Sequence, residues 1–190
     1  MKKNNALTFA LLVVLAMIGT VAHADEYSDT IALFKNAGQS GQMFTHSYGY
    51  AVFPTIGKGG IGVGGAHGSG RVYAHNKYVG DTKMTQLTVG LQLGGQAFSQ
   101  IIFFEDERSF KDFTSGNFEF GAQASAIAIT AGANASAGTT GGSAGASGGQ
   151  KDASTAGKYY KGMAVYTVAK GGLMFEAALA GQKFNYKPRK

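Results

Sequence analysis

The sequence predicts a single α+β domain whose main element is a strongly bent antiparallel sheet, barrel-like or sandwich-like, with two or three short helices. Three observations support this fold class. Apolar and polar residues alternate with a period of two through most of residues 48–186, which is typical of strands with one buried face. Seven glycines fall within residues 59–70, a density that indicates tight bends or close contact between strands. A helical pattern interrupts the alternation near residue 105.

Residues 1–24 have the features of a secretory signal peptide. Two lysines precede an apolar run over residues 6–21, and Ala-His-Ala at residues 22–24 predicts cleavage after Ala24. An uncleaved membrane anchor is the alternative, although the apolar run is shorter than the ~20 residues of a typical span. The chain has no cysteine, which excludes a lipidated cysteine anchor and disulfides. We therefore expect a periplasmic or secreted protein in which residues 25–190 form one domain.

The mature chain is expected to open with a short helix, with Gly38 at the position just past its end. Asp25 or Ser28 is a suitable N-cap residue. Apolar residues recur at helical spacing at Tyr27, Ile31 and Phe34. The polar face of this helix is acidic, so anionic lipid would repel it. The helix is therefore expected to pack on its own domain.

Several strands are predicted after this helix. The first covers residues 50–53 and ends at Pro54, because proline cannot donate to a sheet ladder. The glycine-rich segment that follows is expected to form a hairpin. Its glycines should serve bends or close strand contact: Gly59, Gly60, Gly62, Gly64 and Gly65. Residues 85–97 are expected to bury one face, formed by Leu87, Val89, Leu91 and Leu93. Residues 98–104 read as a separate, more fully buried strand.

The second half of the chain is predicted to contain one helix and further strands. Asp106 is expected to cap a helix that ends before Gly116. A strand is expected over residues 118–128, and residues 131–150, made almost wholly of Gly, Ala, Ser and Thr, are expected to form a partly ordered loop. A last hairpin is expected to turn at Gly171-Gly172.

No pattern in the sequence indicates catalysis, a metal or a cofactor. His46, His67 and His75 lack the spacing of metal ligands. Lys58 precedes the glycines, which is the wrong order for a phosphate-binding loop. The formal charge of +6 falls to +4 once Lys2 and Lys3 leave with the signal peptide. Because the remaining lysines are scattered, this charge favours anionic lipid over nucleic acid, or surface charges that serve only solubility.

Several segments, in this order, resemble the SYLF domain, a lipid-binding family that includes yeast actin-patch regulators and many bacterial envelope proteins. They are GYAVFP at 49–54, the glycine-rich run at 58–70, GLQLGGQ at 90–96, residues 101–107, the helix at 109–114, GAQAS at 121–125 and residues 170–181. The resemblance covers about residues 48–186. It implies binding of phosphoinositides and related anionic lipids. The export signal and the acidic first helix depart from the eukaryotic pattern, so bacterial phospholipid is the expected ligand.

The predicted lipid surface lies around the glycine-rich hairpin. It consists of Lys58, His67, Arg71, Tyr73 and Lys77, in which Lys58, Arg71 and Lys77 bind anionic headgroups and no chemistry is performed. The alternative for these residues is scattered solvated charges. Alternatives for the whole protein are a small outer-membrane β-barrel and a structural or adhesive envelope protein. The sequence identifies no protein partner.

Overall fold

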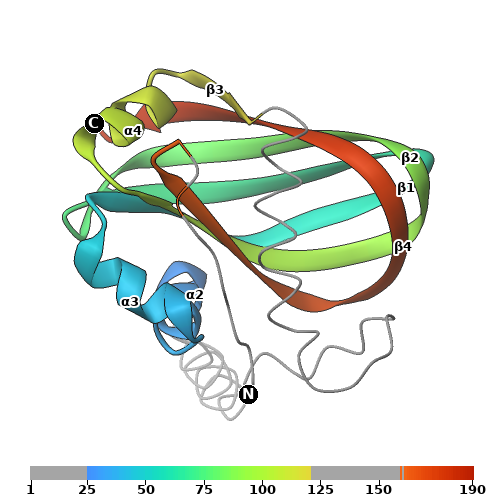
Figure 1. Ribbon diagram of the computed structural model, residues 1–190, viewed down its shortest axis with the longest axis horizontal. Coiled ribbons are helices and arrows are strands. Elements are labelled where there is room, and N and C mark those ends of the chain that lie inside the picture. The colour runs from blue at the N-terminus through green and yellow to red at the C-terminus, as the bar shows by residue number, and fades with distance from the viewer. Residues whose placement is uncertain (1–24, 121–158, 160) are drawn as a thin grey trace, which may run out of the picture.

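The computed structural model describes residues 25–120, 159 and 161–190, which form one antiparallel sheet with three helices (Figure 1). The helices are α2 (Glu26–Lys35), α3 (Gln39–His46) and α4 (Glu107–Phe113), and the strands are β1 (Gly49–Ala74), β2 (Lys77–Phe104), β3 (Asn117–Phe120) and β4 (Met163–Pro188). The order across the sheet is β1-β2-β4-β3. The α+β class and the short helices are confirmed. Within the described residues the sheet is open, with β1 and β3 at its edges, and the barrel-like form is not observed.

Three of the strands are far longer than the sequence predicts. β1 and β2 form one hairpin whose turn is His75-Asn76, where both residues have positive φ (49° and 63°) as in a type I′ turn. The predicted end of a strand at Pro54 is wrong. Pro54 lies at a register shift between Phe53 and Ile56 of an edge strand, so its missing N–H removes no ladder bond.

Two other predicted breaks are also absent. Residues 85–97 and 98–104 belong to one strand, β2. The expected turn at Gly171-Gly172 is wrong as well, because β4 continues beside β2 over its whole length. A register shift opposite Ala97 and Phe98 adds one residue to β4 there. The predicted signal peptide at 1–24, most of the predicted strand at 118–128 and the predicted loop at 131–150 lie outside the described residues.

The long hairpin of β1 and β2 bends over on itself at a segment that we call the tip, residues 60–65 of β1 and 87–94 of β2. A Cβ atom at Gly60 would overlap the backbone of Gly64, and Gly94, the partner of Gly60, has φ 117°. Figure 1 shows β1, β2 and β4 curving together at the end of the molecule opposite α2 and α3. The expected glycine crowding is confirmed at Gly60 and, less severely, at Gly65, where a Cβ would lie 3.2 Å from the carbonyl oxygen of Gln86. It is wrong at Gly59, where the nearest atom to such a Cβ is 3.6 Å away.

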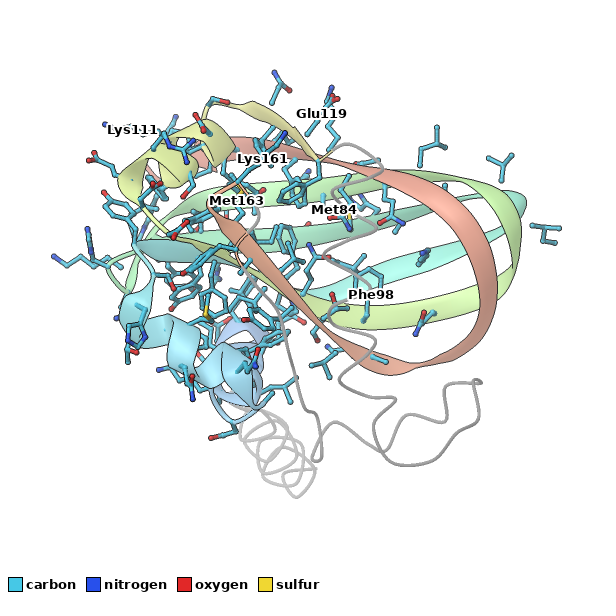
Figure 2. The ribbon with its side chains drawn as sticks, viewed as in Figure 1. Met84, Phe98, Lys111, Glu119, Lys161 and Met163 are labelled. Atoms are coloured by element: carbon cyan, nitrogen blue, oxygen red, sulfur yellow. The ribbon has the colours of Figure 1, made fainter. Side chains whose placement is uncertain are left out.

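The two faces of the sheet have separate hydrophobic cores. The inner core fills the concave side of the bend, and α4 and β3 close it with Phe113 and Phe120. Met84 and Phe98 of β2 belong to this core (Figure 2). The second core lies between the opposite face and helices α2 and α3. It contains Phe34, Tyr50, Val52, Ile101, Phe103, Ala164, Tyr166 and Val168.

The helix caps follow local chemistry. Asp106 caps α4 as the sequence predicts, and of the two predicted candidates for α2 it is Asp25 that caps the helix. The reciprocal capping box that Asp106 forms with Ser109 is not predicted by the sequence. Gly38 does follow α2, with φ 61°, but it is also the N-cap of α3, which the sequence does not predict. A Cβ at Gly41 of α3 would overlap the carbonyl oxygen of Lys35, so this glycine lets the two helices approach closely.

The predicted buried face of β2 is wrong in its first half. Gln86 and Thr88 are buried, whereas Leu87 between them is 65% exposed. Because a strand alternates strictly, burying Met84 in the inner core places Gln86 and Thr88 on the inner side as well. The amide of Gln86 and the hydroxyl of Thr88 have hydrogen-bond partners there: Gln182 Nε2 donates to Gln86 Oε1 at 3.0 Å, and Gln86 Nε2 donates to Thr88 Oγ1 at 3.1 Å. The side chains of Val89, Leu91 and Leu93 lie outside the description.

Candidate functional site

The structure does not bring the five sequence-predicted lipid residues together. Lys58 precedes the bend and pairs with Gln96, whereas the other four follow the bend, and Lys77 lies at the opposite end of the hairpin beside the turn. The predicted hairpin within the glycines is replaced by one continuous strand. His67 is exposed on the outer face, where its Nδ1 lies 3.5 Å from Thr85 Oγ1.

Arg71 of β1 contacts helix α2 and its N-cap residue. Its Nη1 donates to Asp25 Oδ2 at 2.7 Å, and its guanidinium lies 4.0 Å from the ring centroid of Tyr27. A second ring, that of Tyr78, lies 5.2 Å away. Both the charge and the flat faces of Arg71 therefore have partners within the protein, which gives this residue a structural role.

Tyr73 belongs to the same structural cluster. Its ring stacks on Tyr50 with 4.9 Å between centroids. Burial, with a smaller contribution from Tyr73, raises the pKa of Tyr50 to about 12. Burial also raises the pKa of Tyr73, against the opposing effect of Arg71. Both phenols are therefore neutral at physiological pH, and the pair acts as packing beneath α2 and α3.

The outer face of the second half of the hairpin carries exposed lysines from β2 and β4 beside His67 of β1. The register aligns His67 with Thr85 and Lys183, Ser69 with Lys83 and Asn185, and Arg71 with Asp81 and Lys187. Burial alternates along β2, so that residues 81, 83, 85 and 87 are exposed. We call the exposed side chains of His67, Lys83, Lys183 and Lys187 the basic band. They lie on one surface because adjacent strands are about 4.8 Å apart.

The basic band keeps part of its charge uncompensated. Lys183 forms an ion pair with Glu119 of β3 at 3.0 Å, on the outside of the sheet where Figure 2 labels Glu119. Asp81 accepts a hydrogen bond from Tyr78 at 2.7 Å. Within the described parts of the chain, Lys83 and Lys187 form no ion pair, and they supply the band's net positive charge. The exposed carboxylate of Asp81 lies in the row of Lys187 and offsets part of that charge.

An apolar surface adjoins the basic band at the tip. Among the described residues, the exposed large apolar side chains are Ile61, Val63 and Leu87, at 80%, 60% and 65% of their full area. Leu87 is two residues from Thr85 on the same face of β2, so apolar and cationic surfaces are continuous. This combination is suited to a target that is both anionic and apolar.

The sequence misses most of these residues. The signal that could have identified Lys183 and Lys187 is their spacing of four with exposed Asn185 between them, which is a strand's polar face. Leu87 was expected in the core because hydrophobicity alone does not decide which face of a strand is buried. Residues 25–120, 159 and 161–190 contain no group of three His, Asp or Glu side chains arranged to hold a metal ion. Within these same ranges, the longest apolar helical stretch falls short of what a membrane crossing requires.

The fold and this surface define a protein built on one bent antiparallel sheet, whose candidate site is an exposed face. The family model Ysc84, described as "Las17-binding protein actin regulator", matches residues 85–188, more than half of the chain. The protein therefore belongs to this family, which is the SYLF family, and the predicted resemblance is confirmed.

One curated relative supports the assignment. The chain is 28% identical over 156 residues to "Beta cell expansion factor A" of Aeromonas veronii, covering 81% of this chain and 51% of the relative. The chain thus spans about half the length of that protein. No solved structure shows a significant match.

Proposed function

We propose that this protein is an exported lipid-binding protein that associates peripherally with anionic phospholipid in the bacterial envelope, without catalysis. The observation that carries the proposal is the basic band, in which Lys83 and Lys187 lie on one exposed face with His67 and Lys183. Membership of the SYLF family supports lipid as the ligand class. The signal-peptide pattern of residues 1–24 supports the envelope as the location.

The proposed contact differs from the surface expected from the sequence. A lysine near an anionic membrane contributes about 1 kcal/mol of binding free energy. Lys83 and Lys187 together therefore contribute about 2 kcal/mol, or roughly 30-fold in affinity. Lys183 contributes less because Glu119 already neutralises it. Arg71 is engaged by Asp25 and Tyr27, so it stabilises the fold instead of binding lipid.

Protein binding is the second candidate, because the description of the family names Las17-binding actin regulators. An exported chain does not meet the actin machinery inside its own cell, so that activity would require a target outside it. A structural or adhesive role in the envelope belongs to the same class. Retention on phospholipid vesicles without any added protein separates lipid binding from these roles.

Co-sedimentation with vesicles tests the proposal. The mature protein should sediment with phosphatidylglycerol vesicles at low salt and should not sediment with phosphatidylcholine alone. The double variant Lys83→Ala/Lys187→Ala should bind about 30-fold more weakly. Lys58→Ala/Lys77→Ala removes the same charge from positions outside the band and is the matched control, for which we expect less than about 3-fold loss. Failure of the parent protein to bind any anionic vesicle would contradict the proposal.

A further inference from the structure

Among the described side chains at and next to the tip, the large exposed ones are apolar, whereas Gln86 and Thr88 on the inner side are polar. Leu87 is 65% exposed, whereas its neighbours Gln86 and Thr88 are 3% and 0% exposed. On β1, Ile61 and Val63 are likewise exposed. Exposed apolar residues scattered singly need no explanation, but three on one surface indicate a contact with an apolar partner.

We propose that Ile61, Val63 and Leu87 insert into the hydrocarbon of the bilayer, so that the tip acts as a wedge below the headgroups. This inference rests on the proposed lipid binding and adds a defined site and orientation to it. The tip is a convex end of the molecule, and Figure 1 shows α2 and α3 at the opposite end. The three side chains can therefore enter a membrane without displacing either helix.

The position of the basic band identifies a bilayer as the partner. Successive residues on one face of a strand are about 7 Å apart, so the row of His67, Thr85 and Lys183 lies about 7 Å from Leu87, and Lys83 about 13 Å. The headgroup layer begins about 5–10 Å above the depth that interfacial apolar side chains reach. Insertion of Leu87 thus places the row of His67 and Lys183 at the level of the phosphates and Lys83 just above it, whereas Lys187, in the row of Asp81, lies about 20 Å from Leu87 along the strand direction.

A second copy of the chain fits this surface less well. Two tips that meet through Leu87 would bring two basic bands face to face, and like charges at an interface oppose association. An anionic membrane instead satisfies both parts of the surface at once. The glycines that flank the apolar residues, Gly60 and Gly65 among them, add little bulk and keep the wedge narrow.

Depth-dependent fluorescence quenching tests the wedge directly. The chain has no tryptophan, so Leu87→Trp introduces a single probe at the tip. Ser69→Trp, an exposed position on the same face in the row of Lys83, is the matched control. With phosphatidylglycerol vesicles, the probe at position 87 should shift its emission to the blue and be quenched by lipids brominated on the acyl chain. The probe at position 69 should change little.

The outcomes separate the wedge from lipid binding itself. If neither tryptophan variant nor the parent sediments with the vesicles, the proposed function fails. If the proteins sediment but the probe at position 87 keeps a water-like emission, the wedge is wrong and binding is electrostatic only. A blue shift without vesicles, together with elution as a dimer, would assign the tip to self-association and also overturn the inference.

A second pair of variants does not depend on a new probe. Leu87→Gln/Val63→Thr keeps the charge and nearly the size of the side chains while removing apolar surface at exposed positions, so folding should be unaffected. Because salt screens the cations but not apolar contact, the parent should retain a salt-resistant fraction of binding. At high salt, the tip variant should bind the vesicles at least about 10-fold more weakly than the parent. Equal high-salt binding of both proteins would refute insertion.

Discussion

Replacing Gly70 by alanine tests whether the sheet folds tightly over its inner core. A Cβ atom at this position would lie 2.6 Å from Phe53 Cδ1, 2.7 Å from Phe53 Cε1 and 2.8 Å from the carbonyl oxygen of Val52. Phe53 is fully buried and its ring lies 5.7 Å from that of Phe184, so it has little room to move. The carbonyl belongs to the backbone of β1 and cannot rotate away.

Overpacking of this kind costs about 1–3 kcal/mol, and the backbone contact favours the upper half of that range. For a domain of this size each kcal/mol shifts Tm by about 2–4 °C. We therefore expect Gly70→Ala to lower Tm by about 4–12 °C. Gly57→Ala is the matched control, because a Cβ there meets no atom within 4 Å.

Thermal unfolding followed by circular dichroism measures both variants, and urea unfolding gives the free energy. Gly65→Ala, with its nearest contact at 3.2 Å from the carbonyl oxygen of Gln86, should fall between the two. Equal Tm values for the Gly70 and Gly57 variants would show that the two halves of the hairpin are not closely stacked. In that case the bend as described would be wrong.

Three further predictions concern the predicted export signal, the α2 contact and the buried tyrosines. The secreted or periplasmic form should begin at Asp25, which N-terminal sequencing after osmotic shock determines; an uncleaved N-terminus would favour a membrane anchor. Arg71→Met should lower the free energy of unfolding by about 1 kcal/mol, a small loss because the ion pair with Asp25 is partly exposed. It should also speed proteolysis between α2 and the sheet, because the contact of Arg71 with Tyr27 is lost. An unchanged cleavage rate would show that Arg71 does not hold α2 on the sheet. The pKa of Tyr50 is about 12 in the folded protein and 10.0 in an ordinary tyrosine. The contribution of its neutral phenol to stability is therefore fully present below pH 10 and is lost as the pH rises towards 12. Tyr50→Phe should make the free energy of unfolding fall less steeply between pH 10 and 12, which urea unfolding at several pH values measures.

The elements that the sequence predicts well are those set by local chemistry. Asp106 and Ser109 define the start of α4 with their own side chains, and Asp25 does the same for α2. Helix α3 has no such pattern. It is held by contacts from distant segments, since Phe44 packs against Tyr50 and Phe103. The caps of α2 and α4 can therefore be predicted from the sequence, whereas the formation of α3 depends on its packing against the sheet.

The candidate site is predicted in kind but not in position. His67, one of the residues that the sequence predicts to bind lipid, is exposed on the outer face. Lys58 and Arg71 have other environments, and Lys83 and Lys187 replace them. Their proximity arises from pairing β2 with β4, which joins residues about a hundred positions apart in the chain. No local sequence pattern predicts which residues of β2 and β4 pair.

By itself, the sequence determined the dominance of strands, the capped helices, the crowded glycine at the bend and the family, because each depends on residues close together in the chain. Only the tertiary structure decided which face of β2 is buried. Alternation shows that Leu87 and Gln86 lie on opposite faces, yet either face can turn inward. Packing Met84 and Phe98 in the inner core settles the choice, placing Gln86 inside and Leu87 outside.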